Sequence, residues 1–434
     1  MKYFEIKDNA SFDRAAKRLA ARADVSSDES ALKDKLEATR AIVDDVRDRG
    51  DTAVAEYTAR FDKANLSPDR FEIAKAEIDA ATDALDPALV KALEKAHANI
   101  TDFHSRNLRQ SWQEAKPDGS LVGQRLTPIE SVGVYVPGGT AFYPSSVLMN
   151  IVPARVAGVR EIAMVSPPSY HGTLHPLVLA GAKIAGATRV FRVGGAQAVA
   201  ALAYGTNAIP SVLKITGPGN IYVTLAKRLI SSVCDIDKEA GPSEVVVIAD
   251  ANANPDWAAI ELIAQAEHGE DSPVWLVTDS TEMANRVKVS LEKLVPTLSR
   301  RTIIEKALAD CAETYVVRDM NEAARLVNII APEHLSIQTA NPQAVLDEIP
   351  NVGCAVLGGG TSVACGDYMA GPNHILPTSR RARFASPLTA EDFRKVTSII
   401  SYSPDRMRQD ADDIIRLASA EKLDAHARAL ELRK

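Results

Sequence analysis

Four short segments of the sequence place a histidine near a carboxylate or a carboxamide. In the first, Gln265 and His268 are three residues apart, so a helix would project both side chains from one face, where a single metal ion can bind both. Neutral imidazole is a common zinc ligand, and a carboxamide oxygen is a rarer one. Because a histidine at a helix end can also cap the last carbonyl groups, the spacing alone leaves both interpretations open.

The second segment contains the adjacent residues Glu333 and His334. Such a pair can supply a general base and a general acid, since the environment can bring the pKa of either side chain near neutrality. Pro332 precedes the pair and favours a loop or a helix start, and the first turn of a surface helix would have the same sequence.

In the third segment, residues 366–374, glycines and a proline predict an extended loop. This loop would present Asp367 as a metal ligand and His374 as a polar substrate contact, although a solvated loop is the alternative. The fourth segment places Glu421 and His426 in a helical tail, where periodicity alone indicates exposed side chains. Four of the eight histidines lie in these segments, and this repetition indicates a site more strongly than any one pair does.

The composition gives no sign of nucleic-acid or membrane binding. With 50 basic and 57 acidic residues the net charge is −7, which offers no positive surface to phosphate backbones or anionic lipids. The four cysteines include no Cys-x-x-Cys pair, so we expect neither a disulfide framework nor a thiolate zinc site, and a reducing cytoplasm fits. The first eight residues are too charged for a secretory signal. Uncharged runs at 131–154 and 193–213 contain Gly, Pro, Asn and Ser, and we interpret them as buried strand-turn-helix.

Hydrophobic periodicity predicts the elements that position these segments. Apolar residues at helical spacing indicate core-covering helices at 31–49 and 87–108. From Ser131, short apolar strands alternate with glycine turns and helices, which predicts a mainly parallel sheet with ligands at the carboxyl ends of its strands. Strands are expected at 132–136, 162–165, 189–193, 244–250, 274–278, 314–317 and 354–357. Further helices are expected through Ala203 and at 256–268, 391–398 and 411–432.

We therefore predict an α/β protein with two Rossmann-like parallel-sheet domains, because 434 residues exceed one ordinary core. No glycine turn has the Gly-x-Gly-x-x-Gly spacing, so the usual dinucleotide fingerprint is absent. The turns at 217–220 and 241–244 fit a ligand role and a structural role equally well. The expected division is an N-terminal arm at 1–25, a discontinuous first domain at 26–134 and 244–386, a second domain at 135–243, and a helical C-terminal tail at 387–434.

Seven motifs, taken together, resemble the histidinol dehydrogenase family. Each motif is weak alone, but their order and spacing match over almost the whole chain. They are Val136-Pro137-Gly138-Gly139, Gly194-Gly195-Ala196-Gln197-Ala198, Gly217-Pro218-Gly219-Asn220, Ala240-Gly241-Pro242-Ser243-Glu244, Gln265-Ala266-Glu267-His268, Ala331-Pro332-Glu333-His334-Leu335, and Gly366-Asp367-Tyr368 with Gly371-Pro372-Asn373-His374.

The resemblance implies the last two oxidations of histidine biosynthesis, from L-histidinol through the aldehyde to L-histidine, with two NAD per substrate and one zinc. In such a mechanism the catalytic His334 removes the alcohol proton, and the catalytic Glu333 activates water to attack the aldehyde. The implied zinc ligands are Gln265, His268, Asp367 and His426, with nitrogens of the substrate completing the shell.

By the same resemblance, NAD would contact Tyr135, Gln197 and Asn220. The implied substrate-binding residues are Ser243, Gln265, His268, His334, Asp367, His374, Glu421 and His426. Glu421 and His426 would reach the site of a partner subunit, which implies an interlocked homodimer.

Departures from the family pattern occur at Lys238-Glu239, at Ser379-Arg380-Arg381 and at Lys422, and they concern loop geometry and charge at the site rim. Arg380 and Arg381 keep one alternative open, a related NAD-dependent sulfopropanediol dehydrogenase, because a sulfonate substrate needs a cationic pocket. The imidazole of histidinol instead needs a hydrogen-bond acceptor such as Glu421. Two further alternatives are a zinc hydrolase, with Glu333 as the base, and a metal-binding scaffold without turnover.

Overall fold

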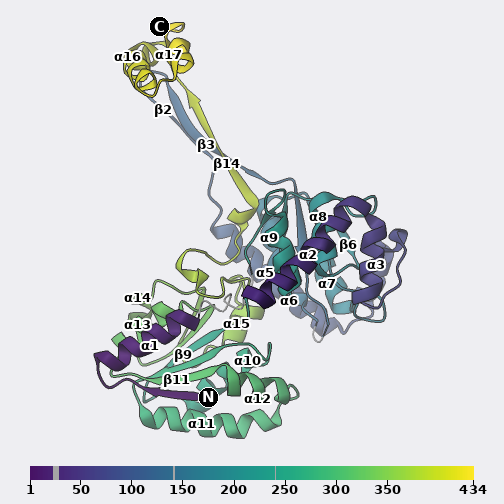
Figure 1. The fold of residues 1–434 in the computed structure, drawn as a ribbon, viewed down its shortest axis with the longest axis vertical. Helices are drawn as coiled ribbons and strands as arrows, with labels where there is room; N and C mark the ends of the chain where they lie inside the picture. The colour runs from purple at the N-terminus through teal and green to yellow at the C-terminus, as the bar shows by residue number, and fades with distance from the viewer. Residues whose placement is uncertain (23–28, 140–141, 240) are drawn as a thin grey trace.

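Two lobes, each built on a parallel sheet, are joined to a projecting arm (Figure 1). The structure is a computed structural model, which describes residues 1–22, 29–139, 142–239 and 241–434. Ala240, the first residue of the motif at 240–244, and the boundary expected at residue 25 lie outside the described residues. Because helices cover both faces of each sheet, the predicted α/β class is confirmed. No helix in the described part of the chain is both long enough and apolar enough to cross a membrane.

The first lobe contains a six-stranded parallel sheet with the strand order β1-β11-β10-β9-β12-β13. Alternate side chains of β9 point to opposite faces: Val246 and Ile248 pack in one core, and Val245 and Val247 in the other. The strands are β1 (Lys2–Glu5), β9 (Val245–Ala249), β10 (Val274–Thr278), β11 (Ala312–Val316), β12 (His334–Gln338) and β13 (Cys354–Leu357). One face is covered by α1 (Asn9–Arg22), α13 (Met320–Ile330) and α14 (Pro342–Asp347), and the other by α10 (Pro255–Ala266), α11 (Thr281–Leu294) and α12 (Arg301–Asp310).

The second lobe contains a five-stranded parallel sheet with the order β6-β5-β4-β7-β8. Its strands are β4 (Ser131–Tyr135), β5 (Glu161–Val165), β6 (Arg189–Phe191), β7 (Lys214–Thr216) and β8 (Asp235–Ile236). Helices on one face are α4 (Lys75–Asp83), α5 (Pro87–Arg106), α6 (Pro144–Ala157) and α7 (Pro176–Ala185). Helices on the other are α2 (Glu29–Arg49), α3 (Asp51–Phe61), α8 (Gly195–Tyr204) and α9 (Ile221–Ile230).

The helices before β4 belong with the second lobe. Helix α2 packs on α8 and α9, α3 on α8, α4 on α7, and α5 on α6. The structure therefore separates residues 29–134 from the unit of 244–386 to which the sequence assigned them, while β1 and α1 join that unit instead of forming an arm. Periodicity indicates that a helix covers a core but does not indicate which core it covers.

Residues 394–434 form the arm together with β2 and β3, and the helix expected at 391–398 is wrong. Residues Ala390–Phe393 form a single 3₁₀ turn, and β14 (Arg394–Ser401) is a strand, in agreement with its β-branched residues. It pairs antiparallel with β3 (Leu121–Pro128), which pairs with β2 (Trp112–Ala115). The tail expected at 411–432 is two helices, α16 (Pro404–Ala420) and α17 (Asp424–Glu431), at the far end of the arm (Figure 1).

Two local expectations near the candidate residues are also corrected. Pro332 and Glu333 do not start a helix, because His334 begins strand β12. Asp367 does not lie in an extended loop but in the short helix α15 (Val363–Tyr368), and the loop begins after it.

Candidate active site

A cavity of about 500 Å³ has walls from both lobes. The second lobe contributes turns at the carboxyl ends of its strands, including Pro137 after β4 and 217–220 after β7. The first lobe contributes the opposite, amino ends of its strands, because α10 runs back against them and ends there with Gln265 and His268. The cavity therefore lies at the carboxyl ends of the strands in one sheet only, whereas the sequence predicted a ligand site at the carboxyl ends.

Glu333 and His334 lie at the amino end of β12 and line this cavity. The Glu333 carboxylate accepts a hydrogen bond from the backbone nitrogen of Glu244 (2.8 Å). His334 lies between two carboxylates, with Nδ1 3.6 Å from Glu333 Oε2 and Nε2 3.4 Å from Asp367 Oδ1. An imidazole placed in this way can pass protons between a substrate and neighbouring carboxylates.

The charges around His334 shift its pKa and that of Asp367. Burial alone would lower the pKa of His334, but the carboxylates of Glu333 and Asp367 outweigh burial and raise it well above its usual value. Burial likewise opposes the ionisation of Asp367, yet His334 holds the pKa of that carboxyl below its usual value. The ligand-free cavity therefore favours a positive imidazole beside negative carboxylates.

His374 also lines the cavity, and its ring is held from both sides. Nδ1 lies 3.0 Å from the backbone oxygen of Asp367, which can only accept, so Nδ1 donates. Nε2 then accepts from the Ser146 hydroxyl at 3.2 Å. Burial lowers the pKa of His374, with Asp367 partly opposing it, so the ring is neutral at pH 7.

Three of the four predicted metal ligands, Gln265, His268 and Asp367, line the same cavity. The Gln265 side chain is 4% exposed, and its Nε2 has no hydrogen-bond partner. Within the described residues, no three His, Cys, Asp or Glu side chains are grouped so that they could hold a metal. The three predicted ligands do not form such a group, because Gln265 is an amide and only two of the three, His268 and Asp367, belong to these four residue types.

The predicted NAD contacts divide into two groups. Asn220 lines the cavity, where its Oδ1 caps α9 by accepting from the backbone nitrogens of Tyr222 and Val223. Tyr135 and Gln197 lie together at Gly195 but are buried outside the cavity wall. The Tyr135 hydroxyl accepts from the Gly195 nitrogen at 3.1 Å, while both polar atoms of the Gln197 side chain are buried without a partner.

Of the remaining predicted residues, Ser243 lines the cavity, but Glu421 and His426 do not. Both are exposed, Glu421 at the end of α16 and His426 in α17, on the projecting arm (Figure 1). The fold of one chain therefore brings together all the predicted metal and substrate residues except the two in the tail.

Two of the departures from the family pattern form one contact. Arg381 Nη2 lies 2.5 Å from Glu239 Oε2, so the acidic residue at one position neutralises the basic residue at the other. Arg380 donates to the backbone oxygen of Ala20 (3.0 Å). Neither arginine lines the cavity, whereas Lys238 does and donates to the backbone oxygens of residues 375 and 386.

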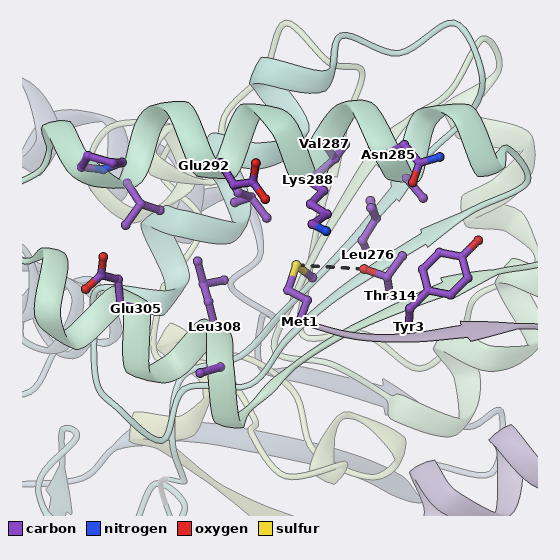
Figure 2. Close-up of a pocket in the computed structure, with 15 residues that line it drawn as sticks. Met1, Tyr3, Leu276, Asn285, Val287, Lys288, Glu292, Glu305, Leu308 and Thr314 are labelled. Carbon is purple, nitrogen blue, oxygen red and sulfur yellow. Dashed lines mark hydrogen bonds between the residues drawn. The ribbon is translucent and has the colours of Figure 1, made fainter.

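A larger cavity, of about 720 Å³, lies beside the edge strand β1 between α11 and α12 (Figure 2). Lys288 extends from α11 toward Met1 and Thr314, and Leu308 faces them from α12 (Figure 2). None of the predicted site residues lines this cavity. It is separate from the candidate active site.

Ser146 and Glu244 were not among the residues predicted from the sequence. Ser146 lies in the first turn of α6, after β4, and the rule that ligands gather after parallel strands is a signal that points to it. Glu244 belongs to the turn at 241–244, for which the sequence left a ligand role and a structural role open. Nothing in its local sequence indicates that its backbone holds Glu333.

Two parallel-sheet lobes share a cavity lined by an adjacent carboxylate and imidazole, Glu333 and His334, and by further side chains that carry nitrogen and oxygen atoms. This arrangement is that of a two-lobed α/β enzyme. A sequence model of the histidinol dehydrogenase family matches residues 25–434. Histidinol dehydrogenase from Rhodopseudomonas palustris is 49% identical over 429 residues, 98% of either chain. That from Geobacillus kaustophilus is 47% identical over 405 residues, 93% of this chain and 95% of the relative.

The crystal structure of histidinol dehydrogenase from Elizabethkingia anophelis is similar to this structure, with a TM-score of 0.91 and 31% identity over 100% of this chain and 98% of that one. The chain belongs to the histidinol dehydrogenase family. The resemblance drawn from the seven motifs is thus confirmed, and the chain is an enzyme of the dehydrogenase class.

A buried ion pair holds the cavity wall at Gly217. Lys227 pairs with Asp237, and both side chains are almost fully buried. Lys227 also donates to the Gly217 oxygen (3.0 Å), and the Gly217 nitrogen donates to Asp237 (2.8 Å).

Replacing Lys227 by alanine is expected to destabilise the protein by about 3–5 kcal/mol, because it leaves the Asp237 carboxylate buried without a partner. Urea unfolding measures this loss. Lys183→Ala, which removes an exposed pair with Asp79, is the matched control and should cost far less. Equal losses for the two variants would contradict a structural role for the buried pair.

Proposed function

We propose that the chain oxidises L-histidinol through L-histidinal to L-histidine, the last two steps of histidine biosynthesis, with two NAD per substrate and one zinc per subunit. Family membership supports this reaction. The observation that carries the proposal is that Glu333 and His334 face the cavity that also collects Gln265, His268 and Asp367. Oxidising an alcohol and then a hydrated aldehyde requires a proton acceptor in each step and a base for water.

Gln265, His268 and Asp367 would hold the zinc, with His426 from a second copy as the fourth ligand. Oxygen and nitrogen donors of this kind suit zinc, and Gln265 would bind it through its carboxamide oxygen. The Gln265 amide is buried and its Nε2 has no hydrogen-bond partner among the described residues, which supports a contact with a bound group. Zinc, when bound, would hold the imidazole and amino nitrogens of the substrate and draw the charge of Asp367 away from His334. Ser243, His374 and Glu421 would complete the substrate contacts.

The acid–base pair would move protons as follows. His334 takes the hydroxyl proton at Nε2, since Nδ1 is buried. In the second oxidation Glu333 takes a proton from water as the water oxygen bonds to the aldehyde carbon, and His334 returns its proton to the carbonyl oxygen. His334 then accepts a proton from the resulting hydrate. NAD, when bound, would accept the hydride in each oxidation.

NAD would bind on the second lobe. There Asn220 lines the cavity, and Gln197 lies in the first turn of α8, which begins at Gly195. The two unpartnered polar atoms of the buried Gln197 side chain support a contact at this turn, because buried polar groups normally have partners. Tyr135 would act indirectly, because its hydroxyl accepts a hydrogen bond from the Gly195 nitrogen and so positions the start of α8.

The tail would act on a second copy of the chain in a homodimer. Glu421 and His426 are exposed on an arm that leaves its own lobes (Figure 1). The arm also exposes large apolar side chains, Ile400 at 73%, Leu417 at 67% and Leu432 at 73%, which supports burial against a partner.

A sulfonated diol is less well supported as a substrate than histidinol. Its recognition would need a cationic wall, whereas Arg381 is paired with Glu239 and Arg380 lies outside the cavity. The carboxylates of Glu333 and Asp367 make the wall acidic, which favours a substrate with cationic nitrogen groups.

NADH formation from L-histidinol tests the proposed function directly. The zinc-loaded protein is expected to form two NADH per histidinol and to lose activity when a chelator removes the metal. Dihydroxypropanesulfonate is the comparison substrate. Turnover of the sulfonate without turnover of histidinol would contradict the proposed function.

Glu333→Gln is expected to retain the first oxidation and slow the second by about 10²–10⁴-fold, because the amide can still accept the Glu244 hydrogen bond but cannot take a proton from water. Rapid-quench analysis would then detect one NADH per histidinol. Glu322→Gln, a buried carboxyl on α13, is the control. Equal slowing of both oxidations would argue against a water-activating role.

Heterodimers that combine a Glu421→Ala chain with a His334→Ala chain are expected to regain activity. Each pairs one intact site with one doubly defective site, so activity should reach about half that of wild type. Co-expression with two different tags isolates the heterodimer for the histidinol assay. Inactive heterodimers would show that the tail does not complete a neighbouring site.

A further inference from the structure

Glu244 contacts both members of the acid–base pair without lining their cavity. Its backbone nitrogen donates to Glu333 Oε2 (2.8 Å), and its backbone oxygen accepts from the His334 nitrogen (3.2 Å). Its own carboxyl is buried, with Oε1 accepting from the Ser379 nitrogen (3.0 Å). Two carboxyl groups therefore lie at the adjacent amino ends of β9 and β12, close enough to interact electrostatically.

The two carboxyl groups face different spaces. Glu333 lines the cavity between the lobes, whereas Glu244 lines a second cavity of about 250 Å³. The walls of the two cavities share Pro242 and Asp271, so the second cavity lies directly behind the first. Ligands that fill the first cavity would cover Glu333 but leave this rear space open.

The charged and titratable groups that face Glu244 come from several elements. Glu333 and His334 lie on the β12 side, and the second cavity adds Asp271, Cys311 and Arg380. Burial and then the charge of Glu333 raise the pKa of Glu244 to about 8, and His334 only partly offsets them. At neutral pH, below that value, the Glu244 carboxyl therefore mostly keeps its proton.

We propose that Glu244 is a positioning residue and that it forms a carboxyl pair with Glu333. The pair takes a proton from water in the cavity between the lobes and releases a proton into the second cavity. The inference rests on the proposed function, which supplies the aldehyde, the water and the hydride acceptor. Two carboxyl groups in one site favour a single shared negative charge, since the ionisation of one opposes that of the other.

The proton balance of the step is complete. An O–H bond of water breaks, its oxygen bonds to the aldehyde carbon, and its proton neutralises Glu333. The C=O π bond opens onto the carbonyl oxygen, which takes the proton held by His334, so that the hydrate is neutral. The loss of that negative charge makes Glu244 a stronger acid, so its O–H bond breaks and the proton passes to water in the second cavity. The pair keeps one negative charge throughout, and nothing is oxidised or reduced in this step. Afterwards the proton left on Glu333 passes to Glu244, which restores the resting state.

A purely structural role for Glu244, in holding the Ser379 loop, predicts something different. Glu244→Gln keeps an oxygen that can accept the Ser379 hydrogen bond but cannot release a proton. A structural role would leave this variant active, or would slow both oxidations together. The carboxyl pair predicts that only the oxidation that consumes water is affected.

The test is the pH profile of each oxidation in the zinc-loaded enzyme, with L-histidinol or L-histidinal supplied together with NAD. For wild type we expect an inflection near pH 8 in histidinal oxidation. In Glu244→Gln that inflection should vanish and histidinal oxidation should slow by about tenfold or more, with histidinol oxidation unchanged. Glu244→Asp, which keeps a titratable group, should restore an inflection.

Glu322→Gln is the control for loss of a buried carboxyl and should keep the wild-type profile. A Glu244→Gln enzyme with an unchanged inflection, or with both oxidations slowed equally, would overturn the inference. Failure of wild type to oxidise histidinol would instead overturn the proposed function, so the two failures are distinguishable.

Discussion

Strands β9 and β12 are tied at their amino ends by Glu244, whose nitrogen holds the Glu333 carboxylate and whose oxygen holds the His334 nitrogen. Glu333 and His334 are therefore positioned by a parallel-sheet ladder and not by a loop. Because β9 is a fully buried central strand, its backbone has few alternative arrangements. A rigid ladder of this kind supplies the preorganisation that proton transfer over short distances requires.

The same ladder brings several ionisable side chains together in the protein interior, where burial disfavours their charged forms. Glu244, Glu333 and His334 are all buried, and Asp367 lies against the imidazole. Burial disfavours the charged form of each group. The protein tolerates these groups because each one accepts a hydrogen bond from a backbone amide, lies beside an opposite charge, or keeps its proton. Perturbed pKa values of this kind, clustered in one cavity, are typical of a site that moves protons.

Much of the fold follows from local sequence. Short β-branched runs such as 245–249 and the helices between them mark parallel α/β lobes, and both sheets match that pattern. Periodicity could not assign α2–α5 to the second lobe, because packing partners are set by tertiary contacts. The helix predicted at 391–398 was wrong for a related reason, since the strand β14 is stabilised by pairing with β3, which is distant in sequence.

The candidate site was predictable in part. Gln265 and His268 are close in sequence and belong to one helix end, so local spacing is enough to pair them. Their proximity to Asp367 and to Glu333 is a tertiary feature, since the ends of α10 and α15 lie beside the amino end of β12 in one cavity wall. Glu244 was missed because its contact with Glu333 is made by its backbone, which side-chain identity does not reveal.

The central claim is that the cavity between the lobes holds zinc and substrate beside the acid–base pair, completed by the tail of a second chain. Zinc-edge anomalous diffraction from crystals of the zinc-loaded protein with L-histidinol tests it most directly. The account predicts one peak per chain, bounded by Gln265, His268 and Asp367 of one copy and His426 of another, with the substrate carbinol carbon facing Glu333 and His334. A peak elsewhere, or a site completed without the tail of another copy, would contradict it.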